Sequence, residues 1–389
     1  MQRYIALLIL FLCLGLNAYS RPVQLSAKAE ISVLTCGPGE DLYATFGHSA
    51  IRVQDHNLGI DIVYNYGTFD FNTPNFYTKF ARGQLLYSLS RERFENFLYT
   101  YQLENRWVKE QILDLDTREK NTLFQFLENN YKPENRKYKY DFLFNNCSTK
   151  IPFVITSVFG NKIGFTEDHL KETSTFRDLI QENLHRNSWS SFGIDLALGA
   201  DIDRKAAVKE HMFLPIYVLK QFDHTQIDNK PLVKRERTVL DPSNGDNSTY
   251  FTTSPLFWLL ILFFFVATIT YIDYRNLTRS RWLDVFLFLI TGVIGIFIIF
   301  LWFFTDHTAT ANNANLLWAV PSHLGLIHIL GSKKPLPDWI HKYSLVSLLF
   351  MGLLFIFWLT GIQTFSPVLL PLLFALILRT AYLWRFTKA

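Results

Sequence analysis

The stretch from Ser32 to Asp70, SVLTCGPGEDLYATFGHSAIRVQDHNLGIDIVYNYGTFD, carries the pattern that decides the fold of the first part of this chain. His48 to Val53 alternates between apolar and polar residues, and Ile60 to Tyr66 reads as a returning strand. A period of two is typical of a half-buried strand. The residues between the two runs, Asp55 to Leu58, form a turn signal, so the stretch predicts a β-hairpin.

The register of this hairpin brings a histidine next to an amide. Centring the hairpin on its turn places Arg52 opposite Asp61 and His48 opposite Asn65. Opposite charges across a strand pair are favourable. An amide oxygen beside an imidazole can fix the tautomer of the ring. His48 and Asn65 are therefore candidate catalytic residues, and the alternative for His48 is a structural histidine at the start of a strand.

The second informative stretch runs from Tyr138 to Gly160, YKYDFLFNNCSTKIPFVITSVFG. Asn145 and Asn146 are favourable helix-cap residues, so Cys147 is expected in the first turn of an apolar helix. Backbone N–H groups and the helix dipole lower the pKa of a thiol there and can hold an oxyanion. Cys147 is thus the candidate nucleophile and Asn146 a candidate substrate contact. The alternatives are a buried structural thiol, a disulfide with Cys36, or Cys36 as the nucleophile.

The two stretches together resemble a papain-like thiol site whose histidine precedes its cysteine. That order resembles the permuted thiol enzymes of the lecithin:retinol acyltransferase type, in which a Gly-His strand precedes a helix that begins Asn-Cys. Gly47-His48 and Asn146-Cys147 match those motifs, and Asn65 stands where that family has a second histidine. The resemblance implies an α+β permuted papain-like domain in which Cys147, His48 and Asn65 are catalytic.

Longer motifs extend the resemblance over residues 30–322. They are TCGPGEDLY, FGHSAIRV, VYNYGTFDF, YDFLFNNCSTKI, GIDLALGADIDRKA and FFTDHTATANNANLLWAVP. These motifs resemble the Bacteroidetes lipoprotein N-acyltransferase (Lnb) family. The resemblance implies that an acyl chain moves from a phospholipid, through a thioester on Cys147, to the N-terminal amine of a diacylated lipoprotein. It implies a phospholipid donor, a lipoprotein acceptor and the lipid bilayer as partners.

The chain becomes strongly apolar after Pro255. Of its 389 residues 49% are hydrophobic and only 19% are charged, and five apolar segments concentrate this bias. Each is about long enough to cross a hydrocarbon core of ~30 Å. Residues 251–389 are therefore predicted to form an all-α membrane domain of about five transmembrane helices, over Leu256–Ile272, Leu283–Phe304, Ala314–Leu330, Ser344–Ile362 and Pro367–Trp384.

The loops between these segments predict their orientation. Asp273–Trp282, Gly331–Tyr343 and the C-terminal tail are basic, whereas Thr305–Asn313 and Gln363–Ser366 contain no Lys or Arg. Basic loops lie on the cytoplasmic side of a membrane. We therefore expect a bacterial inner-membrane protein whose N-terminal domain is periplasmic and whose C-terminus is cytoplasmic.

The N-terminus supports the same orientation. Residues 1–20, MQRYIALLILFLCLGLNAYS, have a positive start, an apolar run and small residues before a predicted cleavage after Ser20. This pattern is typical of a signal peptide, and an uncleaved anchor is the alternative. Residues 21–250 are then the periplasmic domain, which ends in a polar linker predicted over Val233–Ser248.

The outer loop Thr305–Pro321 is the other polar site, directly under the periplasmic domain in this topology. Asp306, His307, Asn313 and Trp318 are predicted to contact substrate head groups there, and a solvated loop is the alternative. The chain has no Gly-rich phosphate loop and no ligand set with metal spacing, so neither a cofactor nor a metal is predicted. A net charge of +4, largely in short loops, makes nucleic acid a poor partner.

Two other functions are consistent with the same residues. A membrane-anchored thiol amidase or peptidase would use the same Cys147–His48 pair, but a single helix would suffice to anchor it. A receptor or assembly factor would use the papain-like domain only as a binding surface. The presence of both Cys147 and His48 weighs against that function.

Overall fold

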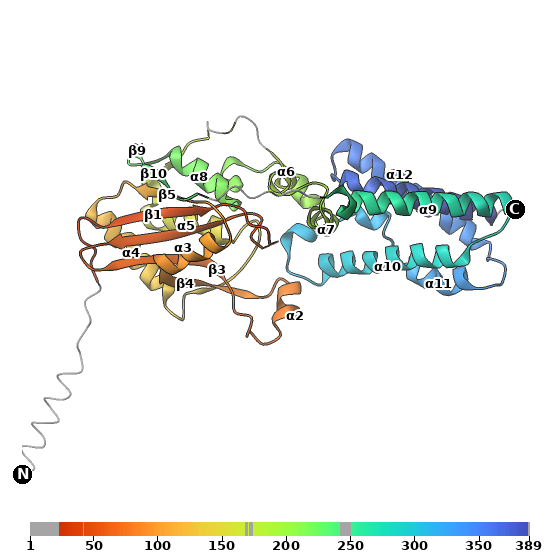
Figure 1. Ribbon diagram of the computed structural model, residues 1–389, viewed down its shortest axis with the longest axis horizontal. Coiled ribbons are helices and arrows are strands. Elements are labelled where there is room, and N and C mark those ends of the chain that lie inside the picture. The colour runs from red at the N-terminus through yellow and green to blue at the C-terminus, as the bar shows by residue number, and fades with distance from the viewer. Residues whose placement is uncertain (1–22, 42, 168–169, 171–173, 242–249, 388–389) are drawn as a thin grey trace, which may run out of the picture.

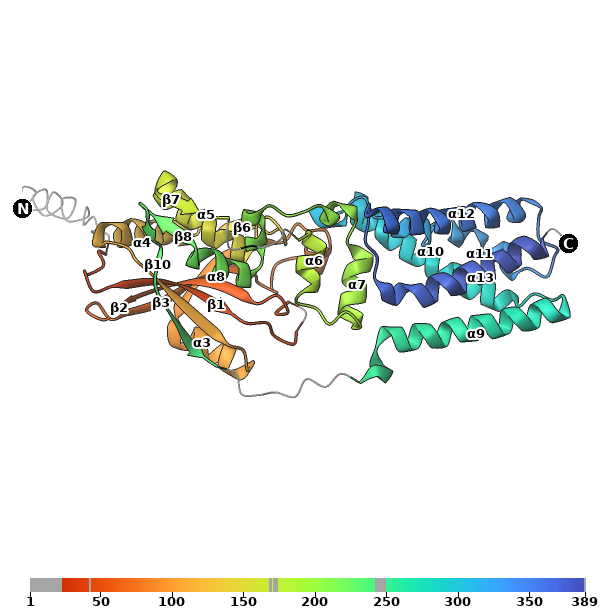
Figure 2. The same cartoon turned by 90° about the horizontal axis from the view of Figure 1, so that it is seen from above.

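The computed structural model describes residues 23–41, 43–167, 170, 174–241 and 250–387. Two regions are arranged end to end in Figures 1 and 2: an α+β domain (residues 23–241) and a helical domain (residues 250–387). The predicted order, an α+β domain followed by an all-α domain, is confirmed. The predicted signal peptide lies outside the described residues.

The α+β domain is built on an antiparallel sheet of seven strands in the order β10-β5-β1-β2-β3-β4-β6. Neighbours in the chain are neighbours in the sheet from β1 to β4, so His48 on β2 lies near Asn65 on β3. The strands are β1 (Glu30–Cys36), β2 (His48–Asp55), β3 (Ile60–Thr68), β4 (Leu86–Arg93), β5 (Val108–Leu113), β6 (Lys137–Lys139) and β10 (Val233–Leu240). A three-stranded sheet adds β7 (Ile163–Phe165), β8 (Thr225–Ile227) and β9 (Lys230–Pro231).

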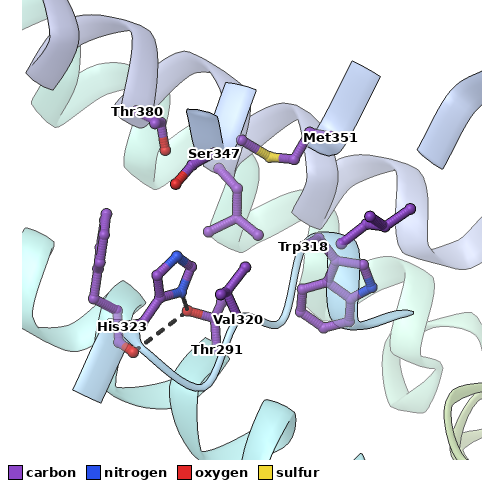
Figure 3. Close-up of a pocket in the computed structure, with 10 residues that line it drawn as sticks. Thr291, Trp318, Val320, His323, Ser347, Met351 and Thr380 are labelled. Carbon is purple, nitrogen blue, oxygen red and sulfur yellow. Dashed lines mark hydrogen bonds between the residues drawn. The ribbon is translucent and has the colours of Figure 1, made fainter. Parts of the chain in front are cut away.

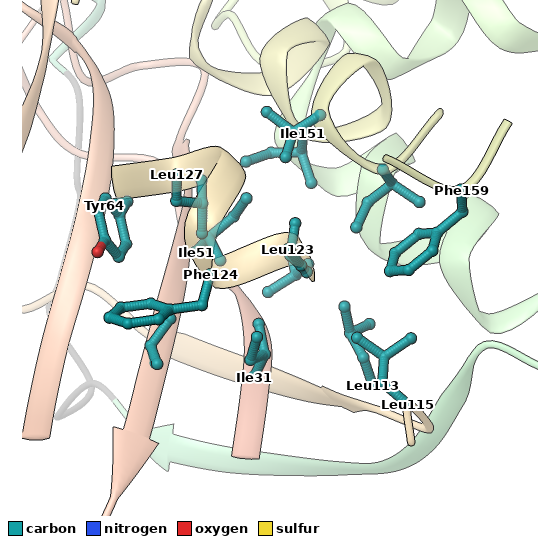
Figure 4. Close-up of a cluster of buried hydrophobic side chains, with 14 of the residues drawn as sticks. Ile31, Ile51, Tyr64, Leu113, Leu115, Leu123, Phe124, Leu127, Ile151 and Phe159 are labelled. Atoms are coloured by element: carbon teal, nitrogen blue, oxygen red, sulfur yellow. The ribbon is translucent and has the colours of Figure 1, made fainter. Parts of the chain in front are cut away.

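Helices cover both faces of the larger sheet. The main core lies between its first strands and α4 (Thr117–Tyr131), α5 (Cys147–Phe159) and α8 (Pro215–Asp223). Figure 4 shows Ile31 and Ile51 of the sheet facing Leu123 of α4 and Ile151 of α5. A smaller core lies under α3 (Phe94–Leu103), and the other α-helices among the described residues of this domain are α2 (Phe76–Ala81), α6 (Phe176–Gln181) and α7 (Trp189–Ala197). Burial of each such side chain contributes roughly 1.5–3 kcal/mol, so α5 is firmly fixed to the sheet.

The β2–β3 hairpin forms as predicted, but its predicted register was wrong by two residues. Arg52 pairs with Val63, and Asp61 pairs with Gln54. The loop is longer than the predicted turn because Gly59, with φ +64, belongs to it. A shift of two residues keeps every side chain on its face. Arg52 therefore still reaches Asp61 diagonally, with Nε 2.8 Å from Oδ1.

The polar segment after Val233 is a strand where a linker was predicted. Residues Val233–Leu240 form β10, which pairs with β5 at the edge of the sheet. Its charged side chains find partners on the neighbouring strands, as Arg237 does with Glu110 at 2.7 Å. An edge strand that is exposed on one side reads as polar in the sequence. Residues 242–249 lie outside the described residues.

The helical domain contains four helices that are long and apolar enough to cross a membrane. They are α9 (Pro255–Asn276), α10 (Arg281–Phe303), α12 (Trp339–Thr360) and α13 (Leu370–Phe386), the last with an added first turn from Pro367. The predicted third span, Ala314–Leu330, is interrupted. It consists of the short helix η6 (Ala314–Leu317), a turn at Pro321 and α11 (His323–Gly331). Proline removes a helical hydrogen bond, which accounts for the interruption.

Contacts at the two ends of the bundle define five passes of the chain. At the far end, Arg379 of α13 binds Asp273 at 2.7 Å and Asp284 at 2.6 Å, and Arg279 binds Asp284 at 2.9 Å. Arg279 also donates to the carbonyl of Leu330, at the end of the interrupted segment. This end therefore holds the α9–α10 connection, the end of α11 and the end of α13.

The near end of the bundle meets the α+β domain. Trp189 Nε1 of the α+β domain donates to the carbonyl of Thr253, just before α9. The N–H of Thr364, which lies between α12 and α13, donates to Asp203 of the α+β domain. The start of η6 is held there too, because the Ala314 N–H donates to Gln363 Oε1 at 2.8 Å. The interrupted segment thus runs the full length of the bundle, as the predicted third span does.

Candidate active site

Cys147 is the first residue of α5, and the side chain of Asn146 caps this helix. Asn146 Oδ1 accepts from the backbone N–H groups of Ser148 and Thr149, both at 2.9 Å. Its Nδ2 donates to the carbonyls of Phe142 and Phe213 at 2.7 and 2.8 Å. Of the two predicted cap residues, Asn145 and Asn146, it is Asn146 that caps the helix. These bonds use both polar atoms of the amide, so a substrate contact by Asn146 would have to displace one of them.

His48, the first residue of β2, lies between Asn65 and the thiol. Its Nε2 is 2.6 Å from Asn65 Oδ1. An amide oxygen only accepts, so Nε2 carries the proton and donates. With the proton on Nε2, the other ring nitrogen, Nδ1, is the one that can accept a proton, and the imidazole shares a hydrogen bond with the Cys147 thiol. The structure thus brings together the three residues that the sequence singled out.

The environment of the Cys147 thiol favours its ionised form. Burial raises the pKa of Cys147, but the charge of His48 and hydrogen bonds from His48, the Ser49 N–H and the Ser148 hydroxyl outweigh burial and lower it to about 7. For His48, burial lowers the pKa and the charge of Cys147 raises it, and the net direction is upward. A lowered thiol pKa beside a raised imidazole pKa is the electrostatic character of a thiolate–imidazolium pair.

Gly67 leaves room for Cys147 beside His48, and this residue was not among the predicted site residues. Gly67 lies in an irregular part of β3 with φ +90. A Cβ atom at this position would be 3.3 Å from Cys147 Cβ and 3.9 Å from His48 Cε1. A larger residue would therefore press on Cys147 and come into van der Waals contact with His48. The only available signal is a glycine two residues after Asn65 in the strand, which often marks a bulge.

Cys36 is a poor candidate for the nucleophile in this structure. Both Cys36 and Cys147 are free thiols, so they do not form a disulfide here. Cys36 lies opposite His48 in the β1–β2 ladder, but its side chain packs under α3 with 1% of its surface exposed. Burial raises the pKa of Cys36 to about 12, against a smaller opposing effect of a hydrogen bond with Tyr101. The thiol of Cys36 is therefore protonated at neutral pH.

The loop that leads into Cys147 contacts the outer loop of the helical domain. Thr308 Oγ1 donates to Asp141 Oδ2 at 2.7 Å, and Lys139 Nζ binds Asp306 Oδ2 at 2.7 Å. His307 packs against Gly83, between α2 and β4. Asp306 and His307 thus lie at the junction of the two domains. Asp141 pairs through its backbone with Asn145, two residues before Cys147, so the thiol lies close to this junction.

Asn313 and Trp318, the other two predicted substrate contacts, are buried. Asn313 is 1% exposed, and its Nδ2 donates to the carbonyls of Leu196 and Ala197 at 2.9 and 3.1 Å. Trp318 is 2% exposed and donates from Nε1 to Asn315. These contacts hold the end of α7 on the helical domain. The structure thus gives Asn313 a part in joining the domains, whereas Trp318 bonds within the helical domain. The predicted role of both side chains in substrate binding stays a prediction.

The helical domain has a small cavity of its own, lined by apolar side chains and a few polar ones. Figure 3 shows it between Trp318, His323, Met351 and Thr380, and His323 Nδ1 lies 2.7 Å from Thr291 Oγ1. Its volume of about 10 Å³ is room for about one water molecule. An acyl chain does not fit in this cavity. Among the described residues, no group of three His, Cys, Asp or Glu side chains is arranged to hold a metal ion.

Comparison with protein families assigns both regions of the chain to one family. Residues 18–182 match the Lnb N-terminal periplasmic domain, and residues 246–389 match the Lnb transmembrane domain. The chain belongs to the Lnb family. The family resemblance inferred from the sequence motifs is thereby confirmed. A search of curated proteins found no match, and a search of solved structures found none.

Family membership assigns one domain of this Lnb chain to the periplasm and the other to the membrane. The α+β domain contains most of the match to the periplasmic domain, and the helical domain contains the match to the transmembrane domain. Together with the four long apolar helices, this makes the chain an inner-membrane protein with a periplasmic N-terminal domain. The Cys147–His48 pair is therefore on the periplasmic side, at the junction with the membrane domain.

Proposed function

We propose that this chain transfers an acyl chain from a phospholipid to the N-terminal amine of a diacylated lipoprotein. Membership of the Lnb family suggests lipoprotein N-acylation. In this proposal Cys147 is the nucleophile, His48 the general base and acid, and Asn65 the residue that orients the imidazole. No cofactor is required.

The proposed reaction has two steps through one covalent intermediate. The Cys147 thiolate attacks the ester carbonyl of the phospholipid, the C–O bond breaks, and His48 gives its proton to the departing lysophospholipid. The lipoprotein amine then attacks the thioester, the C–S bond breaks, and His48 takes the proton from the amine. A thioester is readily attacked by amines, and dividing the reaction lowers each barrier. The N–H groups at the start of α5 are suited to the oxyanion of each step.

The position of the Cys147 thiol is the observation that most supports this proposal. Bonds from Thr308 to Asp141 and from Lys139 to Asp306 fix the segment before Cys147 against the outer loop of the membrane domain. A phospholipid and a diacylated lipoprotein both reside in the membrane. A thiol at this junction is therefore near both lipid-anchored substrates, whereas a soluble peptide substrate would not require such a location.

Mass spectrometry of the intact protein tests the proposal. After incubation with phospholipid alone, the chain should gain the mass of one acyl chain, and hydroxylamine should remove it. A lipopeptide with a free α-amine and a diacylglyceryl cysteine should discharge the thioester and become N-acylated. Cys147→Ala should lose this activity by about 10³-fold or more. Cys36→Ala, which removes the other free thiol, should retain it.

Three results would contradict the proposal. Cleavage of peptides without an acyl-enzyme would favour the thiol amidase or peptidase. If the folded protein neither gains an acyl chain nor cleaves peptides, a binding function would be favoured. An active Cys147→Ala variant beside an inactive Cys36→Ala variant would instead transfer the nucleophilic role to Cys36.

The proposal includes a cytoplasmic C-terminus, supported by the basic residues at the far end of the bundle. Arg279 and Arg379 lie there, as do the basic loops of the sequence. A reporter that is active only in the cytoplasm should work when fused after Ser280, Lys334 or Ala389. It should fail after Asn312, and activity at that position would overturn the five-pass topology.

A further inference from the structure

The connection between β3 and β4 exposes a cluster of aromatic rings. In the described structure, Phe71 is 69%, Tyr77 80% and Phe80 53% exposed. The ring centroids of Phe71 and Phe76 are 4.9 Å apart, and those of Phe76 and Phe80 are 6.2 Å apart, so the rings form one patch. Contiguous exposed apolar patches mark interaction sites. We call Phe71, Phe76, Tyr77 and Phe80 the α2 aromatic patch.

The α2 aromatic patch is fixed at the level where α10 leaves the membrane. The Asp306 N–H donates to the Arg82 carbonyl at 2.8 Å, and His307 packs against Gly83. Asp306 follows three residues after Phe303, the end of α10, whose ring is 64% exposed. Figure 1 shows α2 beside this end of α10. The patch is thus continuous with the outer boundary of the membrane domain.

The composition of this connection fits a lipid surface. Residues 71–83, FNTPNFYTKFARG, contain Lys79 and Arg82 and no acidic residue. Aromatic rings are enriched at the boundary between lipid and water. Apolar faces of interfacial segments sink ~5–10 Å into the head-group region, and nearby Lys and Arg side chains attract anionic lipids. A patch that binds a protein partner would not need to lie at the membrane boundary, so the location of these rings favours lipid.

We propose that Phe71, Tyr77 and Phe80 insert into the outer leaflet and bring a phospholipid to Cys147. The connection begins immediately after the part of β3 that touches the thiol. Phe69 follows Gly67 by two residues, a span of at most about 7 Å. Delivery of the acyl donor rests on the proposed function, whereas insertion of the rings does not.

A wall of aromatic rings leads from the patch toward the thiol. Phe69 contacts Phe71 at 5.1 Å and Tyr87 at 5.3 Å, and Tyr87 stacks on Tyr140 at 4.2 Å. Tyr140 belongs to the segment that leads into Cys147. At the other end of the wall Phe69 follows Gly67 by two residues, and a Cβ atom at Gly67 would be 3.3 Å from Cys147 Cβ. An acyl chain that leaves the leaflet along this wall stays in contact with apolar surface.

Depth measurements on the full-length protein test the insertion. A nitroxide is attached to Tyr77→Cys in a Cys147→Ser background, and the protein is reconstituted in vesicles of phosphatidylcholine and phosphatidylglycerol. The label at residue 77 should collide more often with oxygen, which concentrates in lipid, than with a water-soluble nickel chelate. The matched control is Tyr99→Cys on α3, a 59% exposed tyrosine far from the membrane domain, which should show the reverse. A water-like label at residue 77, or one that neither reagent reaches, overturns the insertion.

A transfer assay tests the delivery. Replacing Phe71, Tyr77 and Phe80 by Ser should slow acylation of Cys147 from bilayer phospholipid by roughly tenfold or more, because the donor is no longer positioned. Acylation from a water-soluble short-chain thioester should be unchanged. The control with Tyr99→Ser and Leu103→Ser should keep both rates. Full transfer by the triple variant overturns delivery. A wild-type protein whose rings insert but which forms no acyl-enzyme refutes the proposed function and leaves the insertion standing.

Discussion

Cys147 and His48 determine each other's protonation. Burial opposes charge on both side chains, and the charge of each partner is the largest effect that opposes burial. Asn65 contributes by accepting from Nε2, which leaves Nδ1 toward the thiol. The reactivity of Cys147 should therefore depend on the imidazole as much as on the helix start.

The first prediction is a pH profile of thiol alkylation by iodoacetamide. Because the pKa of Cys147 is lowered to about 7, the thiolate forms as the pH rises through 7, and the rate should rise over that interval and then level off. In His48→Ala the burial remains but the favourable charge is lost, so the midpoint should move above the ordinary value of 9.0. The rate at pH 7 should fall by about 100-fold, in proportion to the thiolate fraction.

The exposed turn histidine provides the control for this measurement. His56→Ala removes an imidazole from the same hairpin without touching the thiol, and its profile should match the wild type. An unchanged midpoint in His48→Ala would mean that the helix start alone activates Cys147.

The second prediction concerns the glycine beside the thiol. Gly67→Ala should abolish alkylation and acyl transfer, because its Cβ atom would meet Cys147 at 3.3 Å and the backbone has φ +90. Gly59→Ala provides the comparison, since Gly59 also has a positive φ, +64, but a Cβ atom there has no neighbour within 4 Å. It should lower the free energy of unfolding by only about 1–2 kcal/mol and leave the thiol reactive. Equal loss of reactivity in both variants would make backbone strain the cause.

At the scale of elements, α5 places the thiol and the sheet places the imidazole. Asn146 ends the loop and begins the helix, while its Nδ2 donates to the Phe213 carbonyl just before α8. Pro152 lies inside α5, where it removes one helical hydrogen bond. The helix nevertheless continues to Phe159, because its apolar side chains are buried on the sheet.

The third prediction distinguishes the effect of the α5 cap on thiol reactivity from the effect of any helix cap on stability. Asn146→Ala and Thr175→Ala each remove a capping box, at α5 and α6 respectively. Both should lower the free energy of unfolding by about 1–2 kcal/mol, measured in detergent by chemical denaturation. Only Asn146→Ala should also slow the alkylation of Cys147. If Thr175→Ala slows it equally, the effect is one of overall stability.

At the scale of the whole molecule, the two domains are joined by backbone and side-chain bonds. The Gly199 N–H donates to the Ala309 carbonyl at 3.0 Å, and the Ala200 N–H donates to the Asn312 carbonyl at 3.1 Å. Arg177, 3% exposed, supports this segment by binding Asp195 and Asp203. The arrangement fixes the height of the thiol above the membrane.

The fourth prediction tests this junction. A Cβ atom at Gly199 would be 1.6 Å from the Ala311 carbonyl oxygen, so Gly199→Ala must displace one domain from the other. Acyl transfer from bilayer phospholipid should fall by roughly tenfold or more, whereas alkylation by iodoacetamide should be unaffected. Gly193→Ala, at a position with no neighbour within 4 Å, should change neither rate. Normal transfer by Gly199→Ala would show that the junction is not needed for catalysis.

The sequence by itself determined the features that depend on neighbouring residues. Alternation gave the faces of β2 and β3, so His48 and Asn65 were matched even though the register was wrong by two residues. Asn146 marked the helix start at Cys147, since capping is local. Long apolar segments marked the helical domain, because the length needed to cross a bilayer is fixed.

Only the tertiary structure decided what depends on distant residues. Burial of Cys36 under α3 separates the two thiols, and burial is a collective property of packing. Residues Val233–Leu240 become a strand because β5 is there to pair with them. Gly67 matters because the fold brings Cys147 to it from eighty residues away. Helix caps and strand alternation depend on consecutive residues and can be read from the sequence. Contacts between distant residues form only when the whole chain folds.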